Sequence, residues 1–227
     1  THGAGGFDYA DGSCDAIRKA AYISAKHGAT TVYPTCTSSS FSDTLKFVEN
    51  VKSIIKENPP GKPHIAGSHL EGPYFSDAMK GAQNPSYIKA PVKEEYEEFY
   101  KAGEGTLKRI SFAPELPGSI EMCRFFKDNN FLIGLSLDGP EDIHDAFRRD
   151  CGGAPTFARV MKGLELMSRT GVEFNILSTV NARSEGRGAE VYKFLRSLNR
   201  FMQFLPVVEY VRQRPGKRPL IVSPDDE

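Results

Sequence analysis

The sequence has no excess of charge of either sign. Its 29 lysine and arginine residues balance 29 aspartate and glutamate residues in a chain of 227. A balanced charge produces no overall field that would attract nucleic acid or an anionic membrane surface. We therefore expect neither a nucleic-acid partner nor a membrane partner.

The chain also lacks a long apolar run and a cluster of cysteines. No apolar stretch is long enough to span a bilayer. No signal core precedes Thr1, so a cytoplasmic location is expected. The cysteines are few and scattered, and none forms a CxxC or CxxxCxxC cluster, so we expect neither a zinc knuckle nor an iron–sulfur cluster. Reduced, buried thiols are the expected state of all four: Cys14, Cys36, Cys123 and Cys151.

Helical and strand-like segments alternate along the chain. The sequence predicts helices over six segments, 13–26, 42–56, 92–102, 119–130, 156–169 and 188–198. Short β-branched or apolar runs lie between these segments, near Val32, Ile65, Ile110, Leu135, Phe174 and Phe204. This order predicts an α/β protein with about six parallel strands.

Glu71 occupies the end of one of these strands. The apolar run 63–67 leads toward it, and Gly72-Pro73 follows it. Proline supplies no N–H group for a strand ladder, so the strand should stop there. In α/β barrels this carboxyl end of a strand carries the chemistry. Considered by itself, Glu71 would be a turn cap or the partner of a lysine.

The wider pattern around Glu71 is longer and more specific. HLEGPYF at 69–75, followed by KGAQNPSYI at 80–88, resembles N-acetylglucosamine-6-phosphate deacetylase of the amidohydrolase superfamily. This resemblance implies a β/α barrel in which Glu71 binds a divalent metal, zinc or iron, with His2 as a second candidate ligand. It also implies that Ala82 and Gln83 contact a sugar phosphate substrate, although many family members have histidine at the position of Gln83.

From Cys123 onward a second family pattern replaces the first. The segment CRFFKDNNFLIGLSLDGP at 123–140, with Ile143-His144-Asp145 and Arg148 behind it, resembles an anaerobic sulfatase-maturating enzyme. These are radical S-adenosylmethionine proteins of the SPASM group. The resemblance implies that Ser136 and Arg148 bind S-adenosylmethionine; otherwise they would be a helix cap and half of a surface ion pair. The chain has neither the family's CxxxCxxC loop nor its GGEP strand, so cleavage of the nucleotide is not expected.

Two resemblances in one chain predict a chimera of two fragments. Residues 1–121 would be the N-terminal part of an amidohydrolase barrel, 122–212 the middle of a radical S-adenosylmethionine partial barrel, and 213–227 a truncated tail. The fold expected from joining them is a partial or hybrid (β/α) TIM-type barrel with about six parallel strands.

The leading functional hypothesis is the deacetylase reaction. It is the metal-dependent hydrolysis of the acetamide of N-acetylglucosamine 6-phosphate, which yields glucosamine 6-phosphate and acetate. The site is incomplete, because the later histidines and the catalytic aspartate of that family do not appear after residue 121. Two alternatives stay open: a fragment that binds S-adenosylmethionine, and a hybrid without function. A homo-oligomer is compatible with each of them.

Overall fold

The computed structural model describes residues 1–57, 60, 62–77, 80–150 and 152–207. The chain divides into two compact units, Thr1–Cys123 and Arg124–Glu227, which we call unit 1 and unit 2. Helix α4 (Ser119–Asp128) contains the division. Cys151, for which a buried thiol is predicted, and the predicted tail 213–227 lie outside the described residues. This division into compact units does not test the assignment of residues 1–121 and 122–212 to two families, so that assignment stays a prediction.

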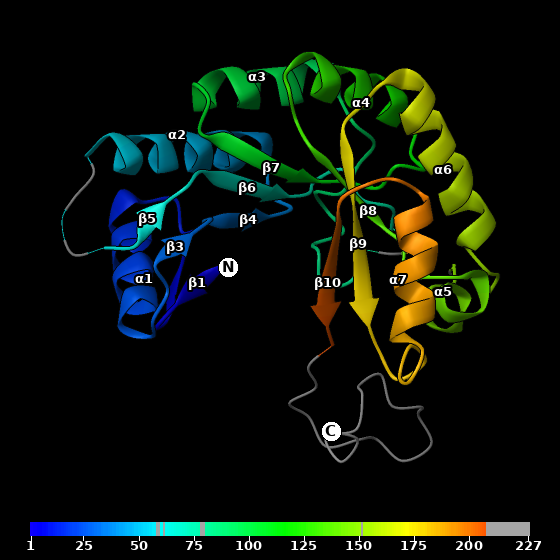
Figure 1. Cartoon of the computed structure of the whole chain (residues 1–227). Helices are drawn as coiled ribbons and strands as arrows, with labels where there is room; N and C mark the ends of the chain where they lie inside the picture. The colour runs from blue at the N-terminus through cyan, green and yellow to red at the C-terminus, as the bar shows by residue number, and fades with distance from the viewer. Residues whose placement is uncertain (58–59, 61, 78–79, 151, 208–227) are drawn as a thin grey trace. The chain divides into compact units, whose positions relative to one another are not determined.

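Unit 1 places helices on one side of short parallel strands. Helices α2 and α3 lie along one side of strands β6 and β7 (Figure 1). The strands are β1 (Gly3–Ala4), β2 (Phe7–Asp8), β3 (Thr31–Val32), β4 (Thr35–Thr37), β5 (His64–Ile65), β6 (Ser68–Glu71) and β7 (Leu107–Ser111); the helices are α1 (Cys14–Lys26), α2 (Phe41–Glu57) and α3 (Lys93–Gly103).

Helix α1 shows how the sequence forms these elements. The hydroxyl of Ser13 accepts a hydrogen bond of 3.1 Å from the N–H of Ala16 and caps the helix at its start. Four of its apolar residues are spaced to share one face and are buried: Ala16, Ile17, Ala20 and Ala21.

Two of the predicted strands are each split into two pieces. Pro34 separates β3 from β4, because it has no N–H group to continue a ladder. Gly67 separates β5 from β6 with φ of +151°, and a Cβ atom there would lie 2.6 Å from the carbonyl oxygen of Thr106. Strand β3 therefore pairs only with β5, while β4, β6 and β7 form a separate parallel sheet in the order β4-β6-β7.

Unit 2 repeats the strand–helix pattern around a smaller core. Its parallel sheet has the order β10-β9-β8. Helices α6 and α7 pack against this sheet around Ile176 of β9 and Leu195 of α7, both fully buried. The elements are β8 (Ile133–Ser136), α5 (Glu141–Phe147), α6 (Phe157–Thr170), β9 (Phe174–Val180), α7 (Gly188–Ser197) and β10 (Met202–Pro206).

The α/β class with parallel sheets is confirmed, but the closed barrel is not. Each sheet in the described part of the chain is open, with two or three strands. The six predicted strand positions all lie in strands, yet the breaks at Pro34 and Gly67 raise the number of parallel segments above six. The antiparallel hairpin of β1 and β2 was not predicted, because strands of two residues carry no periodic signal. Among the described helices, none has the length and apolar character needed to cross a membrane.

Candidate functional site

The sheet β4-β6-β7 has one apolar face and one polar face. Side chains alternate between the faces along a strand. Cys36 and Leu70 are buried in the core of unit 1, where Ile110 packs against them. The residues on either side of these three therefore share the opposite face. The strand register aligns them in two rows, Thr35–His69–Arg109 and Thr37–Glu71–Ser111.

The two predicted metal ligands meet at this face. The Nε2 atom of His2 lies 2.9 Å from Oε2 of Glu71, and their side chains are 48% and 35% exposed. The N–H of Thr35 in β4 donates to the carbonyl oxygen of Thr1 at 3.0 Å, which holds the N-terminal segment beside the sheet. Because Glu71 ends β6, the imidazole and the carboxylate come together at the carboxyl end of the strand, as the sequence predicts.

The donor types suit a metal, but their number falls short. Imidazole nitrogen and carboxylate oxygen are common ligands of zinc and iron. Catalytic zinc sites use three protein ligands. Within the described residues, no group of three or more histidine, cysteine, aspartate or glutamate side chains could hold a metal ion. His2 and Glu71 therefore form part of a metal site at most.

His69 stands one row below Glu71 and was not singled out from the sequence. Its Nε2 atom lies 2.9 Å from Oγ of Ser111, and its Nδ1 atom lies 3.3 Å from Oγ1 of Thr35. Burial, and then the positive charge of Arg109, lower the pKa of His69 to about 4. The ring is therefore neutral at neutral pH. The spacing of two residues between His69 and Glu71 was a signal for this shared face.

The predicted substrate residues are anchored near the same end of the sheet. The side chain of Gln83 is buried, and its Oε1 accepts a hydrogen bond of 2.8 Å from the N–H of Ser38, just beyond β4. Ala82 is exposed. The Ser38 hydroxyl is buried and has no hydrogen-bond partner among the described residues. Gly72 approaches it so closely that a Cβ atom would lie 2.2 Å from its Oγ, and φ of +108° at Gly72 also favours glycine.

Unit 2 contains a second polar cluster, built around Asp138. The Asp138 side chain is 2% exposed and accepts two hydrogen bonds from the guanidinium of Arg148, at 2.8 and 3.1 Å. Arg148 also donates to the hydroxyl of Thr179, at 2.9 Å. Ser136, the other predicted nucleotide-binding residue, is exposed at the end of β8. Among the described residues, the Arg148 guanidinium bonds to Asp138 and Thr179 and not to Ser136.

His144 supports the backbone beside this ion pair. It is fully buried. Its Nδ1 accepts a hydrogen bond of 3.3 Å from the N–H of Asp138. Thr156 donates its hydroxyl proton to the carbonyl of Arg148 at 2.7 Å, so its oxygen accepts from Nε2–H of His144 at 3.1 Å. Burial lowers the pKa of His144, with the Arg148 charge acting in the same direction and the Asp138 and Asp145 carboxylates opposing it. The ring is neutral, with its proton on Nε2.

Segments of the chain are similar to known proteins of two families. The chain is 36% identical over 153 residues to a cysteine-type anaerobic sulfatase-maturating enzyme of Clostridium novyi (strain NT), covering 66% of this chain and 41% of that relative. It is 28% identical over 165 residues to the N-acetylgalactosamine-6-phosphate deacetylase of Escherichia coli O157:H7, covering 72% of this chain and 44% of that relative. Segments of the chain match two families. This supports a two-part hybrid that spans less than half of either relative.

Solved structures give the same pair of resemblances. A structure of anSMEcpe with bound AdoMet matches with a TM-score of 0.56 and 26% identity, covering 81% of this chain and 47% of that one. The N-acetyl-D-glucosamine-6-phosphate deacetylase of Mycobacterium smegmatis matches in fold, with a TM-score of 0.59 and 21% identity, covering 90% of this chain and 59% of that one. No family model matches the chain.

Proposed function

We propose that residues 1–121 carry the metal and substrate half of an N-acetylglucosamine-6-phosphate deacetylase. The contact of 2.9 Å between His2 and Glu71, on the polar face of the sheet, supports this most directly. The parent reaction hydrolyses the acetamide to glucosamine 6-phosphate and acetate. A zinc or iron ion held by these two residues would supply Lewis acidity toward the acetamide carbonyl.

The substrate class in this proposal is an N-acetylated sugar phosphate. Gln83 and Ala82 would lie beside the phosphate, and the unpaired hydroxyl of Ser38 is a donor at the same end of the sheet. A buried hydroxyl without a partner carries a desolvation cost that a bound anion would relieve. Since one curated relative acts on the galactosamine derivative by its name, both hexosamine phosphates belong in the assay.

The test is metal-dependent release of acetate by the full chain. We expect zinc, iron or manganese to raise acetate release from N-acetylglucosamine 6-phosphate above a metal-free control. Glu71→Gln should abolish the increase and weaken zinc binding about tenfold or more, because an amide is a poorer ligand than a carboxylate. Glu97→Gln, on the exposed surface of α3, is the matched control. No release of acetate with any of the three metals would overturn the proposal.

Each unit would then be a piece of a (β/α) barrel in a cytoplasmic protein. The strand–helix order and the parallel pairing in both units support this origin. The unpaired thiols of Cys14, Cys36 and Cys123 agree with a reducing compartment. Burial raises the pKa of the Cys36 thiol to about 12, so it is a packing residue. Self-association of the chain into a homo-oligomer remains part of this proposal.

A second candidate function is binding of S-adenosylmethionine by unit 2. The 36% identity to a sulfatase-maturating enzyme and the likeness to a structure with bound AdoMet favour it. Ser136 is exposed and open to a ligand. The guanidinium of Arg148 is already paired with Asp138, so a ligand bound there would share it with that carboxylate. Calorimetry should show binding that Ser136→Ala weakens and the exposed-surface variant Ser197→Ala does not. Identical heats for the wild type and Ser136→Ala would contradict the assignment; a chain without heat and without acetate release would be a hybrid lacking both functions.

A further inference from the structure

We propose that Ser111 and His69 form a nucleophile–base pair that accepts an acyl group from an activated ester. The site lies on the polar face of the sheet β4-β6-β7, with Ser111 in register with Glu71 and His69 one row away. The reaction requires no metal, so it goes beyond the deacetylase chemistry proposed above.

The hydrogen bonds around His69 fix the tautomer that such a base needs. The hydroxyl of Thr35 donates its proton to the carbonyl oxygen of Tyr33, at 3.1 Å. Its oxygen is therefore an acceptor toward His69, and the ring proton is on Nδ1. The lone pair of Nε2 then faces the hydroxyl of Ser111 at 2.9 Å and accepts its proton. Ser111, His69 and Thr35 are therefore hydrogen-bonded in the order nucleophile, base and orienting group, as in a serine hydrolase triad.

The surroundings suit this role in charge and in rigidity. Ser111 and His69 lie on neighbouring hydrogen-bonded strands, β7 and β6, so their separation does not depend on a loop. Both are only partly buried. Arg109 is in register with His69 and brings to this face a positive charge, the sign that stabilises an oxyanion.

The reaction divides into two balanced steps. In the first, Ser111 Oγ bonds to the acyl carbon, its proton passes to His69 Nε2, and the ester C–O bond breaks to release the alcohol, which takes the proton from His69. In the second, water attacks the acyl group, His69 takes a proton from that water, and the proton returns to Ser111 Oγ as the carboxylic acid leaves.

The experiment uses the full chain with p-nitrophenyl acetate in the presence of EDTA. We expect release of nitrophenolate and an acetyl group on Ser111, located by peptide mass spectrometry of the wild-type chain. Ser111→Ala and His69→Gln should each lower the rate about 100-fold. Ser53→Ala, on the exposed surface of α2 and bonded only to the carbonyl of Glu49, is the control and should retain the full rate.

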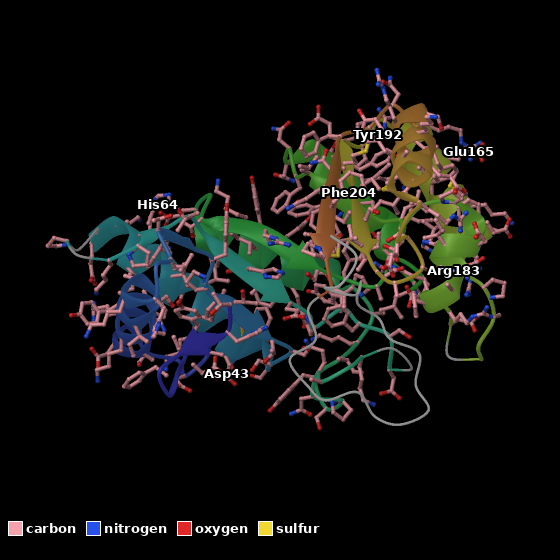
Figure 2. All side chains as sticks on the ribbon, turned by 60° about the horizontal axis from the view of Figure 1, so that its bottom comes forward. Asp43, His64, Glu165, Arg183, Tyr192 and Phe204 are labelled. Atoms are coloured by element: carbon pink, nitrogen blue, oxygen red, sulfur yellow. The ribbon has the colours of Figure 1, made fainter. Side chains whose placement is uncertain are left out.

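Acetylation of Ser111 separates this pair from surface histidines. The side chains of His27 and His64 are exposed, and His64 lies on the surface of unit 1 (Figure 2). Hydrolysis by such rings would leave no acetyl group on Ser111 and would survive in Ser111→Ala. Absence of acetyl-Ser111, or a rate that survives in Ser111→Ala, would overturn the inference. Since EDTA removes metal ions, neither result depends on the deacetylase proposal.

Discussion

Arg148→Ala is expected to lower the free energy of unfolding of unit 2 by about 2–3 kcal/mol. The variant leaves the Asp138 carboxylate, 2% exposed, without its bidentate partner. The Asp138 carboxylate would keep its hydrogen bond of 2.9 Å from the N–H of Thr179, which limits the loss. The Arg148 side chain is 34% exposed, so the cost is below that of a fully buried pair. Urea unfolding followed by circular dichroism measures the change.

Arg159→Ala is the matched control for this prediction. Arg159 and Asp150 also form an ion pair with a distance of 2.8 Å, but their side chains are 60% and 28% exposed. Exposed pairs contribute little to stability, so this variant should unfold almost as the wild type does. Amide exchange at Thr179 adds a local readout, since its N–H bonds to Asp138. Equal losses in the two variants would show that the burial of Asp138 does not matter.

This prediction also bears on how nucleotide binding can be tested. Arg148→Ala would reduce binding of S-adenosylmethionine whether the arginine contacts the ligand or only preserves the fold. Ser136 does not have this double role, because it is exposed at the end of β8 and outside the Asp138 cluster. Ser136→Ala is therefore the more decisive variant, and Arg148 is informative only in a chain whose unfolding has been measured.

The sequence was a good guide to elements and a poor one to their pairing. Helix α1 was predictable because Ser13 caps it and its apolar residues share one face. The end of β6 at Glu71 was predictable because Gly72-Pro73 follows it. The separate pairing of β3 with β5 was not, because it depends on breaks at both Pro34 and Gly67. Which strands pair depends on contacts between strands that are distant in the sequence, and the sequence of one strand carries little information about its partner.

The candidate site was predictable only where the family resemblance named residues. His2 and Glu71 were named together, and they lie in contact. His69 had a usable signal in its spacing from Glu71 along the strand. Ser111 had none, because its partner lies 42 positions away and is reached through strand register. Asp138 was missed for a similar reason, since its pairing with Arg148 depends on the helix α5 between them.

His144→Ala is the second variant with a large expected effect, about 3 kcal/mol at pH 7.5. The ring is fully buried and lies against Phe157, with ring centroids 5.9 Å apart. Its removal leaves a cavity and takes the acceptor from the N–H of Asp138, beside the Arg148 pair. The loss should be visible in urea unfolding of unit 2. His27→Ala, at an exposed position after α1, should leave the stability unchanged.

Acid should reduce the difference between the wild type and His144→Ala. Burial lowers the pKa of His144 in the folded chain below the 6.5 of a free imidazole, so the unfolded chain binds more protons below that pH. Wild-type stability therefore decreases as the pH falls below about 6.5, and the variant lacks this contribution. His69 in unit 1 also has a lowered pKa, so acid reduces stability there too. The wild type and His144→Ala both contain His69, so the difference in stability between them reports on His144 alone. Protonation would place a proton on Nδ1, where the ring now accepts from Asp138. A difference that stays constant with pH would show that folding does not lower the pKa of His144.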